Sequence, residues 1–126
     1  MMTQNRRKTP FRYVLKEPVP FELHILQINS QSVKSKPLQA LLLDLSSSGC
    51  RLSLPVDVQA DHQEIRVSIH MLLHEEPLYL EGTLKWNRTE SGRYHYGVQI
   101  EFPPNGRDQL LRELRILASK NKIIIT

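Results

Sequence analysis

Six short apolar runs, separated by turn-forming residues, constrain the fold of this chain more than any other feature of its sequence. In most of these runs hydrophobic residues occupy alternate positions, as in a strand that buries one of its two faces. The runs lie at 21–28, 38–44, 50–54, 65–71, 78–86 and 94–102. Strands that follow one another about every ten residues and are joined by turns are typical of a small antiparallel barrel. We therefore expect a mainly β protein built on a six-stranded antiparallel barrel, with a bulge or bend at Gly82 in the fifth run.

The hydrophobic period changes only near the C-terminus. Between Leu110 and Ala118, apolar residues recur at helical spacing, with charged residues on the opposite face. Asn105 and Asp108 have the spacing of residues that cap a helix N-terminus, and Asn121 is suited to end the helix. The sequence therefore predicts one α-helix after the barrel.

The charge of the chain indicates how it is organised. The net charge is +4, and five of the 17 basic residues precede the first acidic residue, Glu17. The remaining 12 basic residues nearly balance the 13 acidic ones. We expect a flexible basic N-terminal arm at 1–13 and a single β domain at 14–126, with its helix at about 105–120. A short basic arm suits a compact polyanion better than an extended duplex, so no DNA or RNA partner is expected.

Composition also indicates where the protein works. No apolar run approaches the roughly 20 residues that a membrane helix needs, and no apolar segment of a secretory signal follows the basic N-terminus. The single cysteine, Cys50, excludes an intramolecular disulfide and fits a reducing compartment. We expect a cytoplasmic protein without membrane insertion, with Cys50 in its core.

The turn between the second and third runs carries the most specific motif. Asp44-Leu45-Ser46-Ser47-Ser48-Gly49 has the spacing D-x-S-x-x-G, in which Asp44 and Ser46 can bind nearby backbone N–H groups and Gly49 can take a positive φ. Upstream, Arg6-Arg7-Lys8-Thr9-Pro10-Phe11-Arg12 is close to R-x-x-x-R. With the final strand at 96–102, these motifs are similar to those of the PilZ domain. The sequence resembles a stand-alone, single-domain member of that family.

The PilZ resemblance implies a β-barrel with a C-terminal helix, and a receptor for the bacterial second messenger cyclic di-GMP. It implies that Asp44 accepts hydrogen bonds from guanine, that Ser46 makes a polar contact and that Gly49 allows the turn. The arginines would use their planar N–H groups to bind guanine edges and phosphates. The candidate ligand site comprises Arg6, Arg7, Lys8, Arg12, Asp44, Ser46 and Gly49.

The basic box departs from the family pattern, because the residue four positions before Arg12 is Lys8. Either Lys8 takes the place of the first arginine of the box, or Arg7 does so with one extra residue between it and Arg12. Arg6 could reach the ligand as well. A ligand that orders the arm would leave a changed surface for an unidentified downstream protein. The alternative is a PilZ protein that has lost the nucleotide and acts as a protein–protein adaptor through its helix and the tail at 123–125.

Other functions have weaker support in the sequence. His70 and His74 are four residues apart, but a metal site there lacks a third ligand. The serines of the turn lack the G-x-S-x-G pattern and placed histidine and aspartate partners, so we expect neither an enzyme nor a cofactor. Trp86 stands at an alternating core position, which predicts a packing role in preference to stacking on single-stranded nucleic acid.

Overall fold

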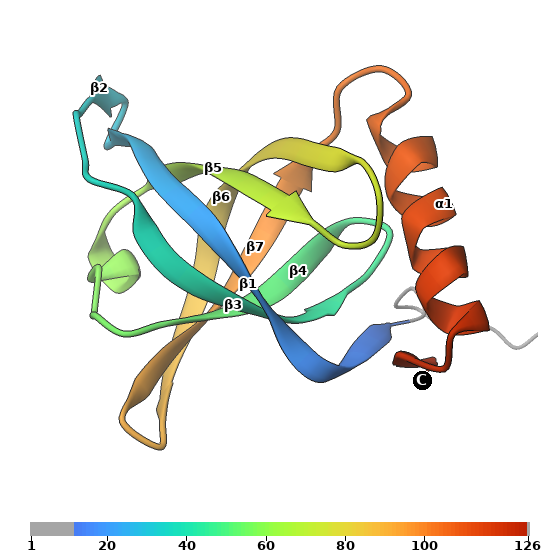
Figure 1. The fold of residues 1–126 in the computed structure, drawn as a ribbon. Coiled ribbons are helices and arrows are strands. Elements are labelled where there is room, and N and C mark those ends of the chain that lie inside the picture. Colours follow the sequence, from blue (N-terminus) through green and yellow to red (C-terminus); the bar gives the residue numbers. More distant parts are fainter. Residues whose placement is uncertain (1–11, 126) are drawn as a thin grey trace, which may run out of the picture.

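The computed structural model describes residues 12–125 as a closed β-barrel with one α-helix beside it (Figure 1). The barrel strands are β1 (Tyr13–Ile28), β3 (Leu38–Leu45), β4 (Gly49–Leu54), β5 (Ile65–Leu72), β6 (Pro77–Glu90) and β7 (Arg93–Glu101). Neighbouring strands are antiparallel in the order β1-β3-β4-β7-β6-β5, and pairing of β1 with β5 closes the barrel. The predicted six-stranded antiparallel barrel with a C-terminal helix is confirmed.

Four further elements complete the fold. They are β2 (Gln31–Ser32), the 3₁₀-helix η1 (Ala60–His62), α1 (Gly106–Ser119) and β8 (Ile123–Ile125). β2 folds back on the end of β1, and β8 pairs with the first three residues of β1. In Figure 1, α1 lies beside the barrel, and the long β6–β7 hairpin extends from the barrel on the side away from the helix.

β1 is long because it closes the barrel, pairing with β3 along its first half and with β5 along its second. Its register against β3 shifts between Val14 and Val19. A strand tolerates proline at such an irregularity, because a missing N–H there breaks no regular ladder. Pro18 therefore does not delay the strand, which begins at Tyr13 and not at residue 21 as the sequence pattern predicts.

Alternating side chains of the six barrel strands form one core. Its largest fully buried side chains include Tyr96, Leu23, Leu42 and Ile69. Burying each side chain of this kind stabilises the fold by roughly 1.5–3 kcal/mol, so the period-two pattern is what selects the barrel. Cys50 lies in the same core, as predicted, and is 4% exposed.

The N-terminus of α1 differs from the prediction. Asn105 has a left-handed φ of 66°, and its side chain caps no backbone N–H. The Gly106 N–H donates instead to the carbonyl oxygen of Pro103 at 2.9 Å. The predicted capping by Asn105 and Asp108 is therefore wrong, because the turn before the helix already supplies an acceptor for this free donor. Asp108 lies in the first turn, where its charge favours the helix dipole.

The C-terminus of α1 agrees with the prediction. Asn121 has a left-handed φ of 60°, and its N–H donates to the Ala118 carbonyl oxygen at 3.0 Å. The Lys122 N–H donates to the Leu117 carbonyl oxygen at 2.9 Å, which completes the reversal that ends a helix. The chain then enters β8, whose Ile123 is buried in the core.

Gly82 does not form the predicted bulge. It pairs regularly with Val67 on one side and with Ile100 on the other. A Cβ atom at this position would lie 2.5 Å from the Gln99 carbonyl oxygen, so close packing of backbones explains the glycine. The register shift in β6 lies instead between Leu84 and Trp86.

Candidate functional site

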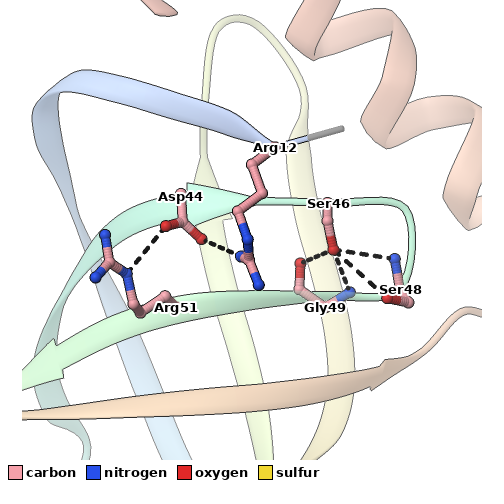
Figure 2. A network of polar contacts seen from close by, with 6 residues as sticks. All are labelled: Arg12, Asp44, Ser46, Ser48, Gly49 and Arg51. Atoms are coloured by element: carbon pink, nitrogen blue, oxygen red, sulfur yellow. Dashed lines mark hydrogen bonds and ion pairs between the residues drawn. The ribbon is translucent and has the colours of Figure 1, made fainter. Parts of the chain in front are cut away.

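The turn between β3 and β4 is held by Ser46. The Ser46 N–H donates to the Gly49 carbonyl oxygen at 2.8 Å, which closes the turn. Its Oγ accepts from the N–H groups of Ser48 at 3.4 Å and of Gly49 at 3.3 Å, as Figure 2 shows. Ser46 is buried, so this set of contacts fixes the shape of the turn.

Gly49 is required for a reason other than the predicted positive φ. Gly92 is the glycine with a left-handed φ in the described part of the chain, and Gly49 has an ordinary negative-φ backbone. A Cβ atom on Gly49 would lie 2.1 Å from the Val98 carbonyl oxygen on β7. The motif glycine therefore lets β4 begin against the β7 backbone, and any larger residue would push the two strands apart.

Asp44 lies beneath two arginines. Its side chain is 3% exposed, and its two carboxylate oxygens accept from different guanidinium groups. Arg12 Nη1 donates to Oδ1 at 2.9 Å, and Arg51 Nε donates to Oδ2 at 2.9 Å (Figure 2). Arg51 stands opposite Asp44 in the β3–β4 register. The buried carboxylate thus holds two half-exposed cations in fixed positions at the surface.

The Asp44 charge also acts on the core behind it. Burial, together with the Asp44 carboxylate, raises the pKa of the Cys50 thiol to about 12. Cys50 therefore stays protonated at neutral pH and is not a nucleophile, because the thiolate is the reactive form. This agrees with the predicted role of Cys50 as a core residue.

Trp86 lies on the outer surface, and the prediction that it packs in the core is wrong. The register shift after Leu84 changes the alternation of β6, so that Trp86 is 42% exposed. Its indole covers Gly97 of β7, where a Cβ atom would lie 2.1 Å from Nε1. The bulge and the glycine together place an aromatic ring on the barrel surface, over Gly97.

Two hollows adjoin at this surface, and both are lined by Arg12 and Trp86. One has a volume of about 300 Å³ and is bounded by Ser46, Gly49 and Lys85. The other has a volume of about 340 Å³ and is bounded by Asp44, Arg51, Arg88 and His95. Of the described residues lining the two hollows, four are Lys or Arg and one, Asp44, is acidic. A basic surface with an aromatic platform suits an anionic ligand that carries a planar ring.

Four of the predicted site residues come together in the structure: Arg12, Asp44, Ser46 and Gly49. Arg6, Arg7 and Lys8 lie outside the described residues. The sequence motifs did not point to the other lining side chains, chiefly Arg51, Trp86, Lys85, Arg88 and His95. Arg51 could have been found, because a hairpin through the D-x-S-x-x-G turn brings it opposite Asp44. No sequence signal reveals the bulge that exposes Trp86.

A metal site and a membrane-spanning helix are two further features to consider in the described residues. Among residues 12–125, no three His, Cys, Asp or Glu side chains are arranged to hold a metal ion. Within the same range, no helix is long and apolar enough to cross a membrane.

Comparisons with known proteins agree on the fold. The model of the PilZ domain family matches residues 5–115. The structure of the Bacillus subtilis inhibitor of motility, MotI/DgrA, is similar with a TM-score of 0.58 and 17% sequence identity. The alignment covers 94% of this chain and 54% of that protein, so this chain spans about half its length. At this identity the likeness shows the fold alone. A comparison with curated protein sequences finds no match.

Proposed function

Because the chain belongs to the PilZ domain family, we propose that it is a cytoplasmic receptor for cyclic di-GMP. PilZ domains are typically receptors for this nucleotide and are not catalysts. The observation that carries the proposal is the arginine pair on Asp44. Arg12 is fixed between two basic hollows by a buried carboxylate, and its side chain is 49% exposed. Its free N–H groups are available to a phosphate or a guanine edge.

Trp86 supplies the second element of recognition. Its exposed indole lies beside Arg12 and lines both hollows. A purine stacked on such a ring gains about 1–3 kcal/mol, and neighbouring cations pair with the phosphates. We assign Trp86 as the stacking surface, with Arg51, Lys85 and Arg88 supplying positive charge around it.

Asp44 has two successive roles in this proposal. Without ligand, both of its oxygens are occupied by Arg12 and Arg51. When Arg12 turns toward the nucleotide, Oδ1 becomes free to accept from the N1–H and N2–H₂ donors of guanine. Arg51 remains on Oδ2, so that the buried carboxylate keeps a counter-ion throughout.

The N-terminal arm completes the site. We propose that Arg6, Arg7 and Lys8 close over the nucleotide when it binds, and that this ordering changes the surface offered to a downstream protein. Amide hydrogen exchange across 5–11, the part of the arm before β1, with and without cyclic di-GMP, tests the idea. Strong protection is expected only with ligand, and strong protection in the free protein would contradict the mechanism.

Calorimetry with purified protein and cyclic di-GMP tests the receptor function directly. Binding is expected at concentrations of tens of micromolar or below, on the order of −6 kcal/mol or better. Arg12→Ala should abolish it and lower the melting temperature only modestly, because Arg51 remains as a counter-ion of the buried Asp44 carboxylate. Arg115→Ala is the matched control, because it removes an exposed arginine of α1 and should leave binding intact. The absence of heat with the wild-type protein would reject the receptor.

A second candidate function is an adaptor that does not bind the nucleotide. It is favoured by Lys8 at the arginine position and by Ile124 and Ile125 of β8, which are about half exposed. Lys8→Arg separates the two functions, because arginine brings the planar fork that lysine lacks. Binding that appears or tightens strongly in this variant would show that the natural box is impaired. Unchanged tight binding would favour the receptor.

A further inference from the structure

A second exposed surface is centred on β5. This strand is two strands from β3, which carries Asp44, and three strands from β4, and β1 and β6 flank it. We call the outer surface of these strands, with the adjoining end of β7, the Tyr79 face. It comprises Pro20, Glu22, Arg66, His70, Leu72, Pro77, Tyr79, Glu81 and Glu101.

The Tyr79 face has an apolar centre. Leu72 is 53% exposed and Tyr79 is 50% exposed, which is unusual for large apolar side chains on neighbouring strands of a small barrel. Cross-strand pairing sets His70 opposite Tyr79 and Leu72 opposite Pro77. Together with Pro20 they line a hollow of about 380 Å³. The hollow is large enough for one or two aliphatic side chains.

Acidic residues surround this centre. A smaller hollow of about 280 Å³ on the other side of Tyr79 is lined by Glu81 and Glu101, and the exposed Glu22 lies across β5 from it. Within the face, Arg66 is the one Lys or Arg, and it already binds Glu101 at 2.7 Å and Glu81 at 3.2 Å. A net negative surface on a chain of net charge +4 repels anionic ligands and attracts cationic ones.

The face is held rigidly before any partner arrives. Tyr79 Oη donates to Glu81 Oε2 at 2.6 Å, and this bond fixes the direction of the ring. The loop after β5 is tied to α1, because the buried Glu113 Oε1 accepts from the backbone N–H groups of His74 at 3.1 Å and of Glu75 at 3.0 Å. A fixed aromatic ring beside an apolar hollow is the usual anchor point of a protein interface.

We propose that the Tyr79 face docks a basic segment of a partner protein. The segment would place an apolar side chain in the hollow beside Leu72 and cationic side chains against Glu22, Glu81 and Glu101. Charge complementarity selects this occupant, because an acidic surface disfavours nucleic acid, anionic lipid and acidic peptides alike. The proposal does not depend on nucleotide binding, since the two sites share no residue.

An NMR titration of the full chain with a short peptide of alternating lysine and leucine tests the proposal. Peptides of lysine with serine and of glutamate with leucine are the matched probes. The lysine–leucine peptide is expected to shift the amide signals of Leu72, Tyr79 and Glu81, and to leave those of Ser46 and Gly49 unchanged. Absence of shifts on the Tyr79 face would overturn the proposal. Equal binding of the lysine–serine peptide would overturn it too, since charge alone would then suffice.

Paired variants keep the test specific. Leu72→Ser combined with Tyr79→Ser removes only side chains that are half exposed, so the fold should persist and its remaining NMR signals should stay in place. Affinity for the lysine–leucine peptide is expected to fall at least tenfold. Val56→Ser removes a similarly exposed apolar side chain outside the face and should leave the affinity for the lysine–leucine peptide unchanged. Equal affinity in the double variant and the wild type would contradict the proposal.

Discussion

The Asp44 cluster and the Tyr79 face of this barrel are built on opposite charge arrangements. Around Asp44, one carboxylate holds two arginines, and around Arg66, one guanidinium holds two glutamates. They differ most in the burial of the central group, since the Asp44 side chain is 3% exposed and that of Arg66 is 23% exposed. A buried ion leaves an uncompensated charge when its partner is removed, whereas an exposed ion pair is screened by water.

Because of this difference in burial, the two clusters should contribute differently to folding and to binding. The Asp44 cluster fixes the position of its arginines, and loss of its centre should affect both binding and folding. The Arg66 cluster keeps the pKa of Glu101 below its usual value through a hydrogen bond, but the Glu101 side chain is 62% exposed. Its contribution to folding is small, and its main effect is on the charge and shape of the surface.

The largest expected effect is that of Asp44→Ala. The change leaves Arg12 and Arg51 without the carboxylate that orients them, and the two like charges then repel. We expect cyclic di-GMP affinity to fall about 100-fold, and the free energy of unfolding to fall by on the order of 2 kcal/mol. Calorimetry and urea unfolding measure the two quantities. Lysine–leucine peptide binding on the Tyr79 face is the control and should be unchanged, and an affinity within twofold of wild type would contradict the assigned role.

Gly97→Ala should have the next largest effect, because its Cβ would occupy the space of the Trp86 indole. Displacement of the ring removes the stacking surface, and nucleotide affinity should fall about tenfold. Trp86 is the only tryptophan of the chain, so its fluorescence reports the displacement directly. Trp86→Ala should lower nucleotide affinity by a similar factor, and the double variant should lower it little more than either single change. Fully additive losses would mean that Gly97 acts through something other than the indole.

The difference between the two surfaces also explains how much the sequence could predict. Alternation predicted the barrel and the core position of Cys50, because those depend on side-chain periodicity alone. The D-x-S-x-x-G spacing predicted the turn after β3 and the place of Asp44 at its start, because both lie within one local segment. Trp86 escaped prediction, since one extra residue in β6 moved it to the other face.

Predictions from neighbouring residues alone were wrong where contacts with other parts of the chain decide the structure. Asn105 caps nothing, because the carbonyl oxygen of Pro103 already accepts the first helical N–H. Gly49 and Gly82 are glycines because neighbouring strands approach closely, which only the assembled sheet reveals. The Tyr79 face requires the pairing of β1, β5 and β6, so its residues are scattered in the sequence.

Glu113→Gln should produce a smaller and more local effect, confined to the Tyr79 side. The loop N–H groups of His74 and Glu75 lose a charged acceptor, and the free energy of unfolding should fall by about 1 kcal/mol. Amide exchange at these two residues should become faster, and the lysine–leucine peptide should bind more weakly because Leu72 lies next to the loop. Nucleotide affinity should stay the same. A matching loss of nucleotide affinity would show that the two surfaces are coupled.

The smallest expected effect concerns the Tyr79 hydroxyl group. Its hydrogen bond to Glu81, helped by partial burial, raises the pKa of Tyr79 above the ordinary value near 10. The folded state therefore holds this proton more tightly than the unfolded chain. The bond is fully present below pH 10 and is lost as pH rises through the raised value. The Tyr79 face should accordingly keep one structure across the physiological range and loosen only in alkali.

Glu81→Gln tests this assignment without touching the barrel core. An amide oxygen still accepts the bond but carries no charge, so the pKa of Tyr79 should move back toward 10 in an NMR titration of the tyrosine rings. Tyr96 is the internal reference, because burial is the largest cause of its own raised pKa and Glu81 does not contribute to it. A Tyr79 pKa unchanged by the substitution would show that burial, and not Glu81, controls the hydroxyl. The ring would then be free to turn, and the Tyr79 face would lose the fixed anchor that distinguishes it from an ordinary exposed sheet.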